Sequence, residues 1–250
     1  MATQKIICIT GGGRGIGAAT AKLAAQAGYS VCLSYLKNRE AAQAIAAEIL
    51  SAGGKAIAVQ ADVSVEADVI RMFDRIDASL GRLTALVNNA GIVEPQARLK
   101  SIDAERLKRV FSTNVFGSFI CAREAVRRMS TASGGAGGAI VNVSSRAAAL
   151  GSPNEYLDYA ASKGAIDTFT VGLAKEVAAE GIRVNAVRPG LIATEMHASG
   201  GEPARIQRLQ STVPMQRGGT AEEVARTIIW LLSGEASYVT GAFVDVSGGR

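Results

Sequence analysis

The most constraining feature of the chain is a regular alternation of short apolar runs with longer amphipathic stretches. The apolar runs have the length of strands and span residues 5–10, 30–35, 55–60, 85–88, 139–144, 183–188 and 243–246. The amphipathic stretches have the length of helices and span residues 15–28, 39–52, 66–80, 103–129, 157–180 and 220–232. Strands joined by helical crossovers form a parallel sheet with helices on both faces. We therefore expect one α/β domain over residues 1–250, built on a doubly wound, seven-stranded parallel sheet.

One long segment, residues 194–219, breaks this rhythm after the sixth apolar run. It contains Gly and Pro at several positions and one short helix-like piece, residues 204–211. A connection at this point lies at the carboxyl edge of the sheet, where open α/β folds bind ligands. We expect a lid over a substrate, and a plain surface loop is the alternative.

Composition excludes several kinds of chemistry. The 27 Lys and Arg residues exceed the 22 Asp and Glu residues, giving a net charge of +5, but they are scattered, so we expect no nucleic-acid partner. The single histidine, His197, leaves no cluster for a metal, and we expect none. Cys8, Cys32 and Cys121 form no C-x-x-C pair, which fits a reducing, cytoplasmic environment. No apolar stretch approaches the roughly 18 residues that span a bilayer, so we expect no membrane partner.

A glycine-rich turn joins the first apolar run to the first amphipathic stretch. Glycines let the backbone approach a pyrophosphate closely, and the helix that follows offers free N–H groups to an anion. Any glycine-rich turn could match this pattern by chance, but its place between strand and helix favours a dinucleotide site. The residues that we expect to hold the cofactor here are Gly11, Gly13, Arg14, Gly15, Ile16 and Gly17.

The second apolar run ends without the carboxylate that commonly binds the ribose 2′-hydroxyl of NAD. Tyr35 stands at its end, and the turn beyond it reads Lys37-Asn38-Arg39. With Arg14 in the glycine-rich turn, these groups favour a 2′-phosphate, held by Arg14, Asn38 and Arg39. Lys37 could replace Arg39, or these could be solvated loop charges. We therefore expect NADP(H) to be preferred, with NAD(H) possible.

Two residues in the stretch 157–180 have the spacing of a proton-transfer pair. Tyr159 and Lys163 stand four positions apart and share one face of a helix. A neighbouring ammonium favours the phenolate and lowers the pKa of a tyrosine from its usual value of about 10. Tyr159 could then act as general acid for a carbonyl being reduced, or as base in reverse. Taken alone, the spacing could also be coincidence.

Further polar residues follow two other strands of the expected sheet. Ser144 and Ser145 end the fifth apolar run, where a hydroxyl can stabilise charge on a substrate oxygen. Asn88-Asn89-Ala90-Gly91 ends the fourth run, where side chains and a tight turn can border the cofactor. Asn114 lies inside an amphipathic stretch, either with a role in the site or as an exposed polar residue.

Together these motifs resemble those of the classical short-chain dehydrogenase/reductase family over about residues 4–249. The matching signatures are Thr10–Gly17, Asp62-Val63, Asn88–Gly91, Asn114, Ser144-Ser145, Tyr159–Lys163, Pro189-Gly190 with Thr194, and Tyr238–Gly241. The resemblance implies a Rossmann fold, a nicotinamide cofactor and a tetrad of Asn114, Ser145, Tyr159 and Lys163. It also implies further cofactor contacts at Asp62, Val63, Asn89, Ala90, Gly91, Pro189, Gly190, Ile192 and Thr194.

The implied roles agree with the chemistry of these side chains. Tyr159 exchanges the proton, Lys163 lowers its pKa and holds the nicotinamide ribose, Ser145 orients the substrate oxygen, and Asn114 supports a water in a proton relay. Ser145 precedes Tyr159 by one residue more than is usual in the family, so Ser144 remains an alternative.

We therefore expect an NADP(H)-dependent oxidoreductase acting on a carbonyl/secondary-alcohol pair. The chain resembles bacterial 3-oxoacyl-carrier-protein reductases and also sugar or polyol dehydrogenases. The sequence does not show which of these substrates it uses. A catalytically silent dinucleotide sensor is the alternative from another class. Residues 195–216 and 147–157 should define the substrate pocket, with Glu195, Met196 and His197 as candidates for its wall. The family resemblance further implies a homotetramer.

Overall fold

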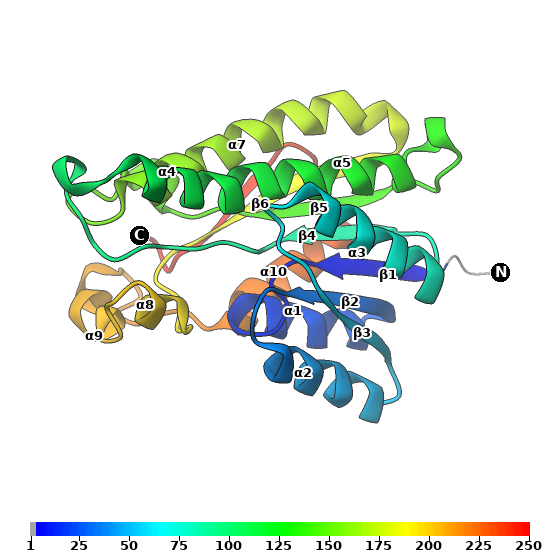
Figure 1. Cartoon of the computed structure of the whole chain (residues 1–250), viewed down its shortest axis with the longest axis horizontal. Helices are drawn as coiled ribbons and strands as arrows, with labels where there is room; N and C mark the ends of the chain where they lie inside the picture. The colour runs from blue at the N-terminus through cyan, green and yellow to red at the C-terminus, as the bar shows by residue number, and fades with distance from the viewer. Residues whose placement is uncertain (1–3) are drawn as a thin grey trace.

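A computed structural model describes residues 4–250, and its helices and strands follow the expected alternation (Figure 1). The strands are β1 (Lys5–Ile9), β2 (Tyr29–Tyr35), β3 (Lys55–Gln60), β4 (Ala85–Asn88), β5 (Gly138–Val143), β6 (Ile182–Pro189) and β7 (Phe243–Val246). The helices are α1 (Gly15–Gln26), α2 (Arg39–Ser51), α3 (Glu66–Ser79), α4 (Ala104–Phe111), α5 (Gly117–Met129), α6 (Ala147–Leu150), α7 (Leu157–Val177), α8 (Met196–Ser199), α9 (Arg205–Leu209) and α10 (Ala221–Leu232).

The strands form one seven-stranded sheet in the order β3-β2-β1-β4-β5-β6-β7, and every neighbouring pair is parallel. This confirms the expected doubly wound Rossmann-type α/β fold. β1 and β4 are neighbours in the sheet but not in the chain. The connections after these two strands therefore leave in opposite directions, and such a switch point opens a crevice at the carboxyl edge.

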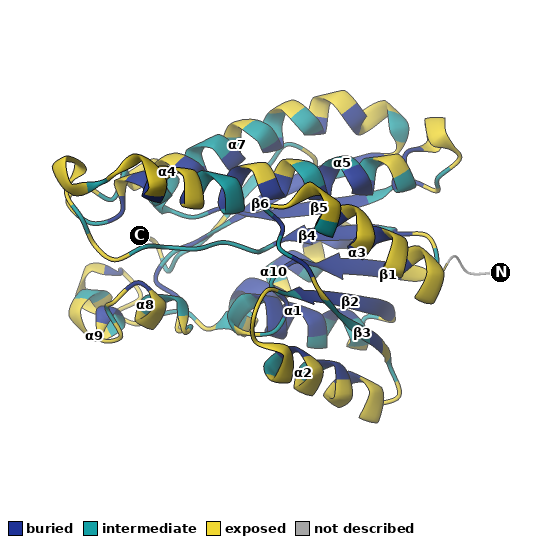
Figure 2. Ribbon diagram, in the orientation of Figure 1, coloured by how far each residue is buried: buried dark blue, intermediate teal, exposed yellow. Residues whose placement is uncertain are grey.

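Helices cover both faces of the sheet because the central strands are apolar on both sides. In β1, Ile7 and Ile9 pack with α1, α2 and α10, while Ile6 and Cys8 pack with α3, α5 and α7. Figure 2 shows the buried strands between helices whose outer faces are exposed. Within residues 4–250, the structure contains no helix with the length and apolar character needed to cross a membrane.

Two local features differ from the sequence expectation. The single helix expected over residues 103–129 is interrupted by a π-helical turn, Ser112–Phe116, between α4 and α5. This turn buries Asn114, whose amide bonds the main chain of Ile92 in both directions, so the interruption is stabilised by a tertiary contact. The short helices α6 and α8 were not expected, because four-residue helices carry too little periodicity to be recognised.

The segment over residues 194–219 contains α8 and α9 and lies beside the carboxyl edge of the sheet (Figure 1). Ion pairs attach it to the loop before α7. Arg205, which is buried, donates to Glu155 at 2.5 Å and to Glu202 at 2.6 Å, and its guanidinium lies 4.9 Å from the ring centre of Tyr156. These contacts hold the segment across the mouth of the crevice.

A buried ion pair positions the start of α7. The guanidinium of Arg106 donates to both carboxylate oxygens of Asp158, at 2.7 and 3.1 Å, and to the carbonyl of Pro95 at 2.6 Å. Burial of Asp158 opposes its ionisation, but the bonds from Arg106 outweigh this and lower the pKa of the carboxyl. The pair joins α4 to the helix that carries Tyr159.

Replacing Arg106 with leucine should destabilise the protein by about 3 kcal/mol or more, because Asp158, only 1% exposed, would lose its counter-charge. Lys108→Ala in the same helix is the matched control. Its partner Glu105 and Lys108 itself are 69% and 70% exposed, so the control should lose no more than about 0.5 kcal/mol. Urea unfolding measures both, and equal losses would contradict the role given to the buried pair.

Candidate active site

The glycine-rich turn after β1 adopts a conformation that side chains would obstruct. Gly11 and Gly15 have positive φ angles of 64° and 51°. A Cβ on Gly17 would lie 2.4 Å from the carbonyl oxygen of Gly11 and 2.6 Å from Nδ2 of Asn89. The third glycine therefore allows α1 to pack closely against the turn, and the first two shape the surface that faces the crevice.

Hydrogen bonds tie this turn to the end of β4. The hydroxyl of Thr10 accepts from the backbone N–H groups of Asn89 and Ala90, both at 3.0 Å. The amide of Asn89 donates in return to the carbonyls of Thr10 and Gly11, at 2.8 and 3.1 Å. Asn89 thus holds the ends of β1 and β4 together at the switch point of the sheet.

A groove of about 410 Å³ runs along this edge. Its lining includes thirteen of the residues expected to bind a cofactor, namely Gly11, Gly13, Arg14, Gly15, Ile16, Tyr35, Asn38, Asp62, Val63, Asn89, Ala90, Gly91 and Thr194. The open space beside the glycine-rich turn and the free face of that turn fit a dinucleotide. Ser34, Ala41, Thr113 and Ile92 also line the groove and were missed, because nothing in their local sequence marks them.

Two expected cofactor contacts lie elsewhere. Gly17 is buried against Gly11 and does not line the groove. Arg39 is the exposed first residue of α2 and is also absent from the lining, whereas Lys37 is present. The reason is the cap of α2. Oδ1 of Asn38 accepts from the N–H of Ala41 at 3.0 Å, so Asn38 and Ala41 line the groove while Arg39 between them is exposed outside it.

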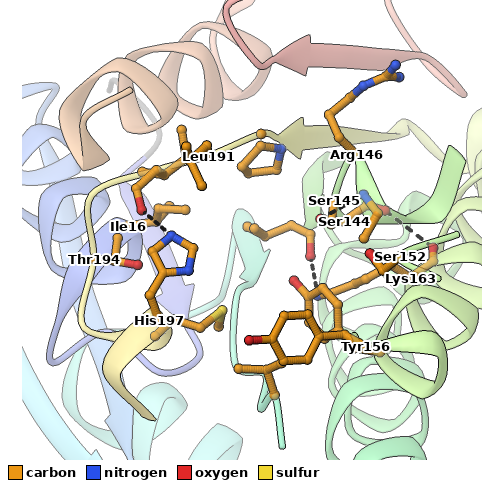
Figure 3. Close-up of a pocket in the computed structure, with 18 of the residues that line it drawn as sticks. Ile16, Ser144, Ser145, Arg146, Ser152, Tyr156, Lys163, Leu191, Thr194 and His197 are labelled. Carbon is orange, nitrogen blue, oxygen red and sulfur yellow. Dashed lines mark hydrogen bonds between the residues drawn. The ribbon is translucent and has the colours of Figure 1, made fainter. Parts of the chain in front are cut away.

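A second cavity, of about 150 Å³, adjoins the groove (Figure 3). Four residues line both spaces: Ile16, Asn89, Thr194 and Met196. The cavity also brings together Ser145, Tyr159, Lys163, Pro189, Gly190 and Ile192, as expected for the reacting end of the site. Residues from the loop before α7 and from α9 complete its wall, among them Ser152, Tyr156 and Arg205.

The pKa of Tyr159 departs from the sequence expectation. Shielding from water raises the pKa of the Tyr159 phenol, and the Ser145 hydroxyl opposes this shift. The Lys163 ammonium lies 5.5 Å from the centre of the Tyr159 ring and donates to the carbonyl of Val143 at 2.7 Å. Burial therefore outweighs the hydrogen bond from Ser145, and the pKa of the phenol is raised where the sequence predicted a lowered one.

Burial acts on Lys163 as well. It lowers the pKa of the Lys163 ammonium to about 8, against an opposing attraction from Asp167. The amine is thus a strongly desolvated group between the Val143 carbonyl and the edge of the groove, and its pKa lies close to neutral pH. Gly91 leaves room there, because a Cβ on it would lie 3.7 Å from Nζ of Lys163 and 3.4 Å from Oδ1 of Asn114.

The two adjacent serines have different surroundings. The Ser144 hydroxyl is buried and donates to the carboxylate of Asp167 at 2.7 Å. Both serines line the cavity, but Ser145 is the more exposed of the two, and its hydroxyl opposes the rise in the pKa of the Tyr159 phenol. The geometry therefore favours Ser145 as the group that meets a substrate oxygen, and it assigns Ser144 a bond within the fold.

Asn114 lies behind the cavity and does not line it. Its amide donates to the carbonyl of Ile92 at 3.0 Å and to the Ser162 hydroxyl at 3.1 Å, and its Oδ1 accepts from the Ile92 N–H. These bonds fix the chain beyond β4 against α7. In this position Asn114 supports the geometry of the site through the backbone around Gly91.

Comparison with known proteins adds independent information. Residues 11–250 match the family model described as enoyl-(acyl carrier protein) reductase. An uncharacterized oxidoreductase of Escherichia coli (strain K12), YgfF, is 62% identical over 245 residues, which cover 98% of this chain and 99% of that protein.

Two solved structures have the same fold along almost the whole chain. The 3-ketoacyl-(acyl-carrier-protein) reductase of Brucella melitensis, complexed with NADH, has a TM-score of 0.90 and 32% identity, covering 98% of each chain. A short-chain dehydrogenase of Burkholderia cenocepacia J2315, in complex with NADP, has a TM-score of 0.89 and 34% identity, covering 98% of this chain and 97% of its own.

The lowered pKa of Lys163 predicts a pH-dependent stability. Between pH 8 and about 10.5 the unfolded chain binds more protons at this lysine than the folded chain, so its burial penalty is full below pH 8 and fades as the pH rises. Lys163→Met removes the penalty. Relief of this penalty should contribute about 3 kcal/mol to the stability of the variant at pH 7, and about 2 kcal/mol of that contribution should disappear by pH 9.5.

Urea unfolding at the two pH values measures this difference. The lost bond to Val143 is a constant offset, and titration of other groups cancels in the comparison. Lys175→Met, at an exposed position of the same helix, is the matched control. An advantage of Lys163→Met that stayed the same from pH 7 to pH 9.5 would contradict the burial penalty.

Proposed function

Because the chain belongs to the short-chain dehydrogenase/reductase family, we propose that it transfers a hydride between NADP(H) and a carbonyl/secondary-alcohol substrate. The observation that carries the proposal is the junction of the two cavities. The groove beside the glycine-rich turn opens into the pocket that holds Ser145, Tyr159 and Lys163. A dinucleotide in the groove would therefore end beside a proton donor.

Ser145, Tyr159 and Lys163 of the smaller cavity each have a separate role in the proposed reaction. The nicotinamide supplies the hydride when the cofactor is bound. Ser145 donates a hydrogen bond to the substrate oxygen, and Tyr159 gives it the proton during reduction or takes it during oxidation. The high pKa of the Tyr159 phenol in the free protein suits a donor that stays protonated until charge develops on that oxygen. Lys163, next to the groove, would hold the nicotinamide ribose and favour the phenolate.

The preference for NADP(H) rests on charge at the far end of the groove. Arg14 and Lys37 both line it, and Tyr35 stands where an acid would repel a 2′-phosphate. Arg14 extends over the groove mouth, where its guanidinium donates to Ser199 of α8 at 3.3 Å. The solved relatives include one complex with NADH and one with NADP, so the argument depends on this chain's own residues.

Two alternatives to this proposal remain, one with another substrate and one without catalytic activity. A relative with a known complex is a 3-ketoacyl-(acyl-carrier-protein) reductase, and a sugar or polyol dehydrogenase would use the same tetrad. A silent dinucleotide sensor is disfavoured, because nothing would maintain Ser145, Tyr159 and Lys163 around one cavity.

We further propose a homotetramer. Phe116 in the π-helical turn and Phe119 in α5 are 57% and 46% exposed, and Phe119 stacks on Phe169 of α7 with ring centres 3.8 Å apart. On α7, a Cβ at Gly172 would meet nothing within 4 Å. An exposed apolar face with room for close approach suits a second copy. Residues 243–246 would form the other interface. Light scattering measures the assembly, and a monomer at micromolar concentration would contradict it.

The proposed compartment is the cytoplasm. Cys8, Cys32 and Cys121 are all buried and unpaired, which fits a reducing environment. Burial raises the pKa of the Cys121 thiol well above its usual value, so this residue is protected from oxidation. Cell fractionation tests the location.

Tyr159→Phe should lower turnover by a factor of about a thousand or more, because it removes only the hydroxyl that exchanges the proton. Binding of the dinucleotide should change little. The measurement is NADPH absorbance against a panel of ketones, aldehydes and sugars, with cofactor binding followed by fluorescence. Tyr238→Phe, at a fully exposed position, is the control and should keep full activity. Wild-type turnover in Tyr159→Phe would exclude the mechanism.

Wild-type kcat/KM should be higher with NADPH than with NADH. A charge-assisted hydrogen bond contributes roughly 1.5–3 kcal/mol, which is about tenfold to a hundredfold in binding. Arg14→Ala and Lys37→Ala should therefore each reduce the ratio of the two efficiencies at least tenfold. Arg39→Ala, outside the groove, is the matched control and should change the ratio by less than about twofold. Equal efficiency with both cofactors in the wild type would remove the 2′-phosphate argument.

A further inference from the structure

His197, the only histidine of the chain, has one ring nitrogen that is bonded within the fold. It lies on α8 in the wall of the smaller cavity, and its Nε2 is 2.9 Å from the carbonyl oxygen of Ile192. A carbonyl oxygen only accepts hydrogen bonds, so Nε2 carries the proton in this contact. The ring is therefore fixed in orientation by the chain that follows β6.

The other ring nitrogen faces the cavity. In Figure 3 a dashed line marks the bond from one nitrogen of the His197 ring, and the second nitrogen lies on the side of the ring toward Tyr156, which also lines the cavity. Among the described residues 4–250, no hydrogen bond is made to this Nδ1. Burial lowers the pKa of the imidazole, so at neutral pH Nδ1 bears a lone pair and accepts hydrogen bonds.

The nearby positive charge is already neutralised. Arg205 also lines the cavity, but its guanidinium is bonded to Glu155 and Glu202. Leu150, Leu191 and Met196 contribute apolar surface to the same wall. Arg146, which pairs with Asp245, and Arg250 line the cavity as well. The cation that acts on the His197 imidazole is Arg205, so a carboxylate or phosphate beside Nδ1 would meet a lone pair and an arginine that is already paired. The chemistry of the wall therefore fits a neutral substrate that brings its own hydrogen-bond donor.

We propose that His197 is a specificity residue, which accepts a hydrogen bond at Nδ1 from a hydroxyl of the substrate near the reacting carbonyl. The inference rests on the proposed function and names its substrate class as neutral hydroxyketones and the corresponding diols or polyols. A 3-oxoacyl thioester is disfavoured, because its second carbonyl places an acceptor, not a donor, beside the ketone. A site built to bond a hydroxyl discriminates against the analogue that lacks it, since the acceptor then loses its hydrogen bond.

The test compares three ketones that differ only in the hydroxyl: 2-butanone, 3-hydroxy-2-butanone and 4-hydroxy-2-butanone. With NADPH, wild-type kcat/KM should be about tenfold higher for at least one hydroxyketone than for 2-butanone. His197→Leu should remove this preference, because it should lower the hydroxyketone value about tenfold more than the 2-butanone value. His197→Gln keeps a donor for the Ile192 carbonyl and an acceptor for the substrate, so it should retain most of the preference.

The KM for NADPH and the thermal unfolding midpoint of each variant separate a specificity effect from general damage, since a merely structural role would change all three substrates alike. Wild-type reduction of 2-butanone and the hydroxyketones at equal efficiency, or a full preference in His197→Leu, would overturn the role of His197 and leave the proposed function standing. Absence of turnover with these ketones and with the whole panel of carbonyl compounds would instead overturn the proposed function, and the specificity inference with it.

Discussion

The hydrogen bonds between the end of β1 and the end of β4 are the constraint on which the rest of the site depends. β1 and β4 are neighbours at the point where the strand order reverses, and their connections diverge there. Thr10 and Asn89 join the two ends through four hydrogen bonds. This junction holds the glycine-rich turn beside Gly91, so the groove for a dinucleotide and the pocket for a substrate meet at one place.

The helix that carries Tyr159 and Lys163 is held by contacts that also impose a cost in stability. Arg106 and Asp158 fix its first turn, and Asn114 fixes the chain opposite to it through Ile92 and Ser162. The same packing buries Lys163, lowers the pKa of its ammonium to about 8 and opposes ionisation of Tyr159. The lowered pKa of Lys163 and the protonated phenol of Tyr159 are thus consequences of burial. The stability of the surrounding fold offsets the free-energy cost of burying these groups.

The substrate end of the site is assembled from segments outside the regular alternation. The loop before α7 contributes Ser152 and Tyr156, and the segment after β6 contributes His197 and Arg205. Ion pairs between Arg205 and Glu155 join these two segments, so the cavity wall is one connected structure. Because neither segment contains a strand of the sheet, its side chains can differ without moving Tyr159 and Lys163, which lie in α7.

Short-range patterns in the sequence determined the fold class, because strand and helix periods and turn glycines act within a few residues of one another. The four-residue spacing of Tyr159 and Lys163 likewise placed both on one helix face, and the glycine-rich turn marked the dinucleotide site. The tertiary structure decided what depends on distant neighbours. It separated Ser144 from Ser145 through Asp167, replaced Arg39 by Lys37 in the groove, and raised the pKa of Tyr159 by burial that no local pattern encodes.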